Sequence, residues 1–144
     1  MPLVNTPNQQ IGQTSPFPPG VAFDGSTYHM VWVANNPSRD LLYATSPDGI
    51  NWTRGPNLDE KSRAAPAVGI LLGRVVAAFV ADNDSRQIIY SLFDPLTGTW
   101  SHNLNTGESS RAGVSMVVVN NQAHLYFVAN NPSNDLLEIV ISLH

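Results

Sequence analysis

The chain has 144 residues, no cysteine, only 12% charged side chains and a net charge of −4. Its length suits a single domain, and a hydrophobic fraction of 42% argues against a disordered chain. Net acidity without a basic run argues against nucleic acid or an anionic membrane as a partner. No apolar run approaches the ~18 residues that span a bilayer. No cleavable signal segment is visible either, which leaves the compartment open between cytoplasm and non-classical release.

The first predicted elements are short strands separated by turn residues. Residues 20–24 are a short apolar run, and residues 28–34 are rich in β-branched and aromatic side chains. The polar loop 35–40 ends this strand, residues 41–46 form the next one, and a Pro-Asp-Gly turn leads to a last short strand at 50–53. Such runs, divided by Asn, Gly, Pro and Ser, are typical of β-hairpins. Because no stretch has sustained helical spacing with capping residues, the sequence predicts an all-β chain.

The same order of elements returns twice along the chain. Residues 33–42 recur at 128–137 with an offset of 95, and a more divergent copy lies midway at 80–89. Four further pairs keep this spacing or half of it: Trp52 and Trp100, Glu60 and Glu108, Arg63 and Arg111, and His29 and His124. The chain therefore consists of three units of 47–48 residues.

A unit of this size with four antiparallel strands matches one blade of a β-propeller. We assign residues 15–61 to repeat 1, 62–109 to repeat 2 and 110–144 to repeat 3, which ends before a fourth strand of its own. Residues 1–14 stand where a fourth strand would be, so we expect them to complete the last blade. The predicted fold is thus a β-propeller with three four-stranded blades per chain.

Three blades are too few to close a ring, because propellers need roughly four to eight. We therefore expect a homodimer that forms a six-bladed ring, with each N-terminal strand completing a blade of the partner. Such an exchange also covers a sheet edge that would otherwise invite aggregation.

Two features resemble known families. Residues 46–52 (SPDGINW) look like the Asp-box of sialidase-type propellers, shortened by one residue, and residues 94–100 are a looser version. The middle unit resembles a blade of bacterial and fungal β-propeller lectins, including fucose-binding ones, on 65–68, 73–74, 79–80, 88–90 and 100–101. The resemblance implies glycan binding in pockets between adjacent blades of an assembled ring. Fucose-binding members use an Arg, a Glu and an aromatic residue in each site. Glu60 with Arg63, and Glu108 with Arg111, match that set in kind, whereas the first unit has Gln13 and Pro16 there.

The order of strands in a blade places three polar loops and the linkers between units on one rim. Their amide, carboxylate and guanidinium groups offer the donors and acceptors that sugar hydroxyls need. The candidate ligand-binding residues are Asn35, Asn36, Arg39, Asp40, Glu60, Arg63, Asp82, Arg86, Glu108, Arg111, Asn130, Asn131 and Asp135. A second interpretation stays open, because Asn-Asn-Pro-Ser is also good turn chemistry and the charged residues can be plain surface.

Other conspicuous side chains have structural interpretations. We expect Trp32, Phe79 and Phe127 in the core between blades, and Trp52 and Trp100 as anchors of the outer strand. We expect Asp48 to bind backbone amides of its own turn. His29 and His124 lack a neighbouring cluster of metal ligands, so we predict no metal and no cofactor.

The sequence favours a lectin, a carbohydrate-binding protein with several shallow sites, over an enzyme. Three near-equivalent units would duplicate any catalytic set around the ring, whereas a glycosidase needs one asymmetric pair of carboxylates. Repeated weak sites suit binding by avidity. Two alternatives stay open: a scaffold for protein–protein interaction, and a sialidase-like glycosidase.

Overall fold

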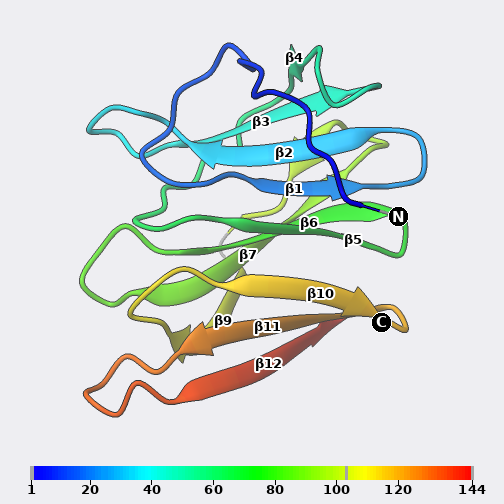
Figure 1. Ribbon diagram of the computed structural model, residues 1–144. Coiled ribbons are helices and arrows are strands. Elements are labelled where there is room, and N and C mark those ends of the chain that lie inside the picture. The colour runs from blue at the N-terminus through cyan, green and yellow to red at the C-terminus, as the bar shows by residue number, and fades with distance from the viewer. Residues whose placement is uncertain (1, 103, 144) are drawn as a thin grey trace.

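The computed structural model describes residues 2–102 and 104–143, which form twelve β-strands in three antiparallel sheets (Figure 1). We call the sheets blades 1, 2 and 3 in chain order. Blade 1 contains β1 (Gly20–Phe23), β2 (Tyr28–Val33), β3 (Leu41–Ser46) and β4 (Thr53–Arg54). Blade 2 contains β5 (Ala67–Leu71), β6 (Arg74–Val80), β7 (Gln87–Asp94), β8 (Thr99–Trp100) and β9 (Leu104–Ser109). Blade 3 contains β10 (Ser115–Val119), β11 (Gln122–Val128) and β12 (Leu136–Ser142).

The all-β prediction is confirmed. The division of the chain into units 15–61, 62–109 and 110–144 stays a prediction, and the strands of each blade fall within one of these units. Met1 of the predicted N-terminal strand, Asn103 of repeat 2 and His144 of repeat 3 lie outside the described residues. Over the part of the chain that is described, no helix is long and apolar enough to cross a membrane.

The blades stack through their first strands, so that β1 lies against β5 and β5 against β10 (Figure 1). Two glycines permit this close approach. A Cβ atom on Gly20 would lie 2.8 Å from Val68 Cγ2, and one on Gly69 would lie 2.7 Å from Met116 Sδ. Both distances are too short for a real Cβ atom, so a larger residue at either position would push the blades apart.

Apolar side chains fill both spaces between blades. Phe79 is fully buried between blades 1 and 2, and Phe127 is buried between blades 2 and 3. Trp32 is also buried, on the face of blade 1 that points away from blade 2, where Met30 and Trp52 accompany it. Burial between blades is therefore confirmed for Phe79 and Phe127, whereas Trp32 is buried on the opposite face of blade 1 and not between blades 1 and 2.

Trp100 is the wedge that joins the outer parts of blades 1 and 2. Its side chain is buried in an edge-to-face contact with Tyr43 (5.1 Å between ring centroids) and a tilted contact with Phe93 (5.2 Å). Its indole N–H donates to the carbonyl oxygen of Pro56 at 3.1 Å, and Leu58 belongs to the same cluster. The expected anchoring role is confirmed for Trp100.

The β2–β3, β6–β7 and β11–β12 loops share one hydrogen-bond pattern. In the first loop, the Ser38 N–H donates to Asn36 Oδ1 (2.9 Å) and the Asp40 N–H donates to Ser38 Oγ (3.2 Å). The same two bonds recur at Asn83, Ser85 and Gln87, and at Asn131, Ser133 and Asp135. Each loop also holds one residue in the left-handed region: Arg39 (φ 57°), Arg86 (52°) and Asn134 (57°). Turn formation by these Asn and Ser residues is confirmed.

The outer strands depart most from the prediction. In blade 1, β4 covers Thr53–Arg54 rather than residues 50–53, because Asp48 Oδ1 accepts the N–H groups of Ile50 (2.8 Å) and Asn51 (2.9 Å). These bonds confirm the turn-binding role of Asp48 and, led by the Asn51 bond, hold the pKa of its carboxyl well below the usual range. In blade 2, β8 and β9 share the outer position along β7.

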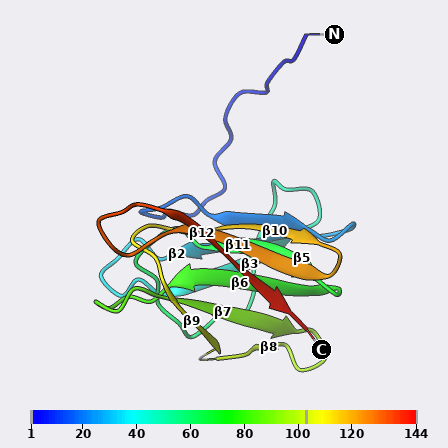
Figure 2. The same cartoon turned by 90° about the horizontal axis from the view of Figure 1, so that it is seen from below.

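Blade 3 has three strands, and β12 forms its outer edge. Residues 2–14 form no strand and are exposed, and Figure 2 shows the first part of the chain, in blue, running away from the sheets. Completion of a third blade by residues 1–14 stays a prediction.

Candidate functional site

A cavity of about 330 Å³ opens where the linker from blade 1 to blade 2 passes the β6–β7 loop. Its lining consists of Asp59, Glu60, Lys61, Ala81, Asp82, Asn83 and Ile89. We call this the acidic cavity, because three carboxyl groups line it. Two of them, Glu60 and Asp82, were predicted site residues that the structure brings together.

Backbone pairing fixes the two walls of the acidic cavity. Ser62 forms an antiparallel bridge with Ala81, and the N–H of Arg63 donates to the carbonyl of Val80 (3.1 Å). Asp59 lies in the left-handed region (φ 57°), which turns the linker just before Glu60. The carboxyl groups therefore stand on a paired, ordered backbone.

The side chains of the cavity differ in exposure. The Glu60 side chain is only 15% exposed, and its Oε1 lies 3.8 Å from Nδ1 of His102. Asp59 and Asp82 are exposed. Lys61 Nζ donates to Asp40 Oδ1 (2.7 Å) and to the carbonyl of Ser38 (2.9 Å), and the Asp40 bond lowers the pKa of that carboxyl. The cavity thus combines the half-buried carboxyl group of Glu60 with two exposed carboxyl groups. The Lys61 ammonium group beside them is bonded to Asp40 and Ser38.

The three-carboxyl set occurs at one of the junctions only. At the junction of blades 2 and 3, Gly107, Glu108 and Asn130 stand in the places of Asp59, Glu60 and Asp82. Before blade 1, the repeat puts Gly12, Gln13 and Asn35 there. The units repeat the same order of strands and loops, but the side chains at these three equivalent positions differ.

The predicted arginines act on backbone rather than in the cavity. Arg63 donates to the carbonyl of Asn83 (2.7 Å) and lies 3.9 Å from Asp84. Arg111 donates to the carbonyl of Asn131 (3.0 Å), and Arg86 donates to the carbonyl of Arg111 (3.1 Å). Arg63 and Arg111 therefore hold the β6–β7 and β11–β12 loops in equivalent ways, rather than pairing with Glu60 and Glu108.

The remaining predicted residues are spread along the rim. Asn35, Asn36 and Arg39 line a second cavity of about 350 Å³ together with Pro16, and the Arg39 guanidinium lies 5.3 Å from the centre of the Phe17 ring. Glu108, Asn130 and Asp135 are exposed. The structure thus divides the thirteen residues between separate places on the rim.

Sequence reasoning missed Asp59, Lys61 and Asn83 as lining residues. Comparison of the units at equivalent positions would have found Asp59 and Asp82, since both carboxyl groups are lost in the next unit. Sequence reasoning also missed a set of side-chain hydrogen bonds in blade 1. The buried His29 bonds the exposed Asp24 through Nε2 and Oδ2 (2.8 Å), and the buried Tyr43 hydroxyl through Nδ1 (2.7 Å). Burial, aided by the Asp24 charge, raises the pKa of Tyr43 to about 12. This arrangement ties strands together rather than facing a cavity of the rim.

No family model and no curated protein matches the sequence. Among the solved structures that resemble the fold are three at 14–16% identity. They are an exo-β-1,3-galactanase from Phanerochaete chrysosporium, solved with galactose (TM-score 0.62, 16% identity), GH43B of a xyloglucan PUL of Bacteroides ovatus (0.57, 15%) and YjhT (0.53, 14%). The matches cover 82%, 86% and 85% of this chain, in that order. The chain spans only 33%, 26% and 38% of the length of these proteins.

The likeness confirms the propeller fold, and the chain corresponds to a run of consecutive blades. It does not support the resemblance to fucose-binding lectins or to an Asp-box. Two of the three neighbours carry names of glycoside hydrolases, and none carries the name of a lectin. This finding overturns the predicted lectin function and the expectation that the chain is not an enzyme. The reasoning failed because it treated the units as equivalent, whereas the acidic cavity is specific to one junction.

Proposed function

We propose that this chain belongs to a propeller that hydrolyses glycosidic bonds, with its chemistry in the acidic cavity. The observation that carries the proposal is the gathering of Asp59, Glu60 and Asp82 around one cavity. Glycoside hydrolysis needs a carboxylic acid that protonates the leaving oxygen and a second carboxylate that acts as base or nucleophile. The names of the two glycosidase neighbours support the same reaction class.

Exposure suggests how the roles divide. Glu60 is the candidate acid, because its side chain is largely withdrawn from solvent. Asp82 and Asp59 are exposed and are the candidates for the second carboxylate. The amide of Asn83 offers donors and an acceptor for sugar hydroxyl groups. Arg63 acts as a positioning residue in this proposal, since it holds the carbonyl of Asn83 next to Asp82.

We further propose that the ring around this site is closed by a second copy of the chain. Three blades do not complete a propeller, and the outer face of blade 3 leaves apolar residues in solvent. Leu136 is 81% exposed and Val140 is 45% exposed. Their equivalents in blade 2, Ile88 and Leu92, are buried between blades.

The test is hydrolysis of a panel of aryl glycosides, β-1,3-galactan and xyloglucan oligosaccharides by the chain and two matched variants. Glu60→Gln removes the proposed acid, and Glu108→Gln changes the equivalent residue at the junction that lacks the other carboxyl groups. We expect Glu60→Gln to lose roughly 10²- to 10⁴-fold in rate, while Glu108→Gln keeps the full rate. No turnover by folded protein, or equal effects of the two substitutions, would contradict the proposal.

A further inference from the structure

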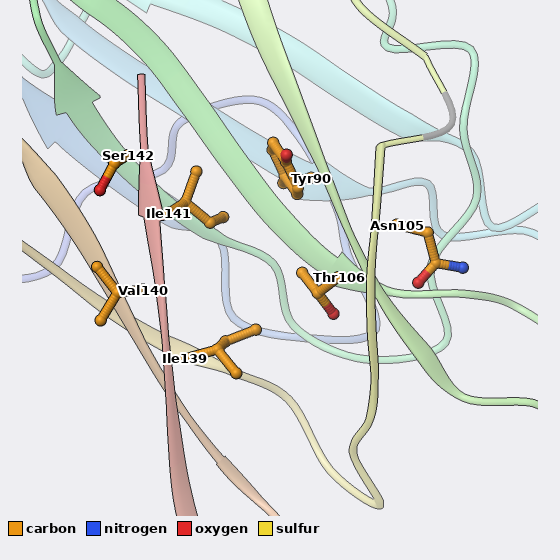
Figure 3. A pocket seen from close by; sticks show the side chains of 7 residues that line it. All are labelled: Tyr90, Asn105, Thr106, Ile139, Val140, Ile141 and Ser142. Atoms are coloured by element: carbon orange, nitrogen blue, oxygen red, sulfur yellow. The ribbon is translucent and has the colours of Figure 1, made fainter. Parts of the chain in front are cut away.

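A groove of about 530 Å³ runs beside the edge strand β12. Figure 3 shows its lining: Tyr90, Asn105, Thr106, Ile139, Val140, Ile141 and Ser142. The groove therefore lies between the outer part of blade 2 and the strand at which blade 3 ends.

The repeat identifies this groove with the site that Trp100 fills one junction earlier. Trp100 packs against Tyr43, Phe93 and Leu58. The equivalent residues one blade on are Tyr90, Ile141 and Thr106, and all three line the groove. Thr106 also repeats the backbone contact of Leu58, since its hydroxyl donates to the carbonyl of Ile88 where the Leu58 N–H donates to that of Leu41. The groove is thus the site between blades 2 and 3 that is equivalent to the Trp100 site between blades 1 and 2.

Spacing along the chain names the segment that fits this position. Trp52 precedes Arg63 by 11 residues and Trp100 precedes Arg111 by 11, so the residue 11 before Pro16 is Asn5. The groove suits this residue better than a tryptophan, because Thr106 and Ile141 replace Leu58 and Phe93 and add a hydroxyl to the lining. The two residues before Asn5 are apolar and exposed, with Leu3 100% and Val4 92% exposed.

A second, independent observation points to the same segment. The Trp100 indole N–H donates to the carbonyl of Pro56, 44 residues before it. The Trp52 indole nitrogen is buried, yet it has no hydrogen-bond partner among the described residues. By the same offset of 47 that places Asn5, the residue equivalent to Pro56 is Gln9. Its carbonyl would satisfy this donor if residues 2–14 followed the path of a linker between blades.

The distance that the N-terminal segment can span decides whether Asn5 fills the groove of its own chain or that of a second copy. Trp52 lies with Trp32 on the face of blade 1 that points away from blades 2 and 3. With Gln9 held there, the four residues to Asn5 span about 13 Å. Blade 3 lies two sheet spacings from blade 1, about 20 Å. Asn5 can therefore fill the groove of a neighbouring copy but not that of its own chain.

We propose that residues 2–14 of one copy complete blade 3 of a second copy, with Asn5 in the groove and Thr6 opposite Val140. The Thr6 position follows from the pairing of Thr53 with Thr45 in blade 1. This inference rests on the ring closure included in the proposed function, and it adds the strand that is exchanged.

The absence of cysteine from the chain makes the test direct. Thr6→Cys and Val140→Cys are made as separate proteins, refolded together and oxidised, with light scattering of the unoxidised mixture run in parallel. The control pairs Thr6→Cys with Leu96→Cys, which lies 94% exposed in the turn before β8. Disulfide geometry is strict, so we expect roughly tenfold more covalent dimer from the first pair than from the control.

The outcomes separate the two levels of the proposal. A dimer in solution with equal or negligible cross-linking of both pairs would overturn the strand exchange and leave ring closure standing. A monomer in solution without specific cross-linking would overturn both. Either result leaves the glycosidase assignment to its own assay, since Glu60 and its cavity lie within one chain.

Discussion

Substitution of Trp100 tests the packing that holds the blades together. Trp100→Ala removes a buried indole from contacts with Tyr43 and Phe93 and deletes its hydrogen bond to the Pro56 carbonyl. Truncation of a buried Trp to Ala costs about 3–5 kcal/mol, and the lost hydrogen bond about 1 kcal/mol within that total. A domain of this size has only about 5–15 kcal/mol of stability in all, so we expect a large loss.

Trp100→Phe is the matched variant, because it keeps an aromatic ring in the wedge and removes the indole donor. Its expected cost is about 1–2 kcal/mol, the sum of a smaller ring and one hydrogen bond. Urea unfolding measures the loss of stability in both variants. All proteins are compared at one concentration, because the stability of an associating protein depends on its concentration. A Trp100→Ala protein that loses less than about 1 kcal/mol would refute the wedge role.

Two further substitutions test the β1–β2 turn and the contact between blades 2 and 3. Asp24→Asn should destabilise the fold by about 1–2 kcal/mol at pH 7, because the Asp24 carboxylate accepts bonds from His29 (2.8 Å) and from the N–H groups of Ser26 and Thr27. These bonds, led by that of His29, lower the pKa of Asp24, so its contribution is complete above the unfolded value of about 3.9 and is lost as pH falls through the lower folded pKa. Urea midpoints of the two proteins that stay equally far apart from pH 7 down to pH 2 would contradict this linkage. Gly69→Ala places a Cβ atom 2.7 Å from Met116 Sδ and 2.8 Å from Val118 Cγ2, which should cost about 1–3 kcal/mol in the same assay; an unchanged midpoint would mean that blades 2 and 3 are not in close contact.

Much of the fold could be predicted because the repeat restates it three times. The loops at Asn36, Asn83 and Asn131 have one hydrogen-bond pattern because they have one local sequence, and local bonds of Asn and Ser decide their shape. Phe79 and Phe127 are buried because alternation along a strand directs them to the same face.

The candidate site was harder to predict because it depends on pairing between distant segments. Asp59 and Asp82 are 23 residues apart, and backbone pairing of Ser62 with Ala81 and of Arg63 with Val80 brings their segments together. Arg63 was expected to pair with Glu60, yet its guanidinium donates to the Asn83 carbonyl. Nothing in the local sequence distinguishes a backbone carbonyl from a ligand as the partner of an arginine.

The claim that the chain is half of a closed propeller is tested most directly by its mass in solution. Light scattering or sedimentation equilibrium of the chain, with folding confirmed by a cooperative urea transition, gives this mass without any substitution. The account predicts a particle of twice the chain mass of 15.6 kDa. A stable, folded particle of 15.6 kDa across the concentration range would contradict it.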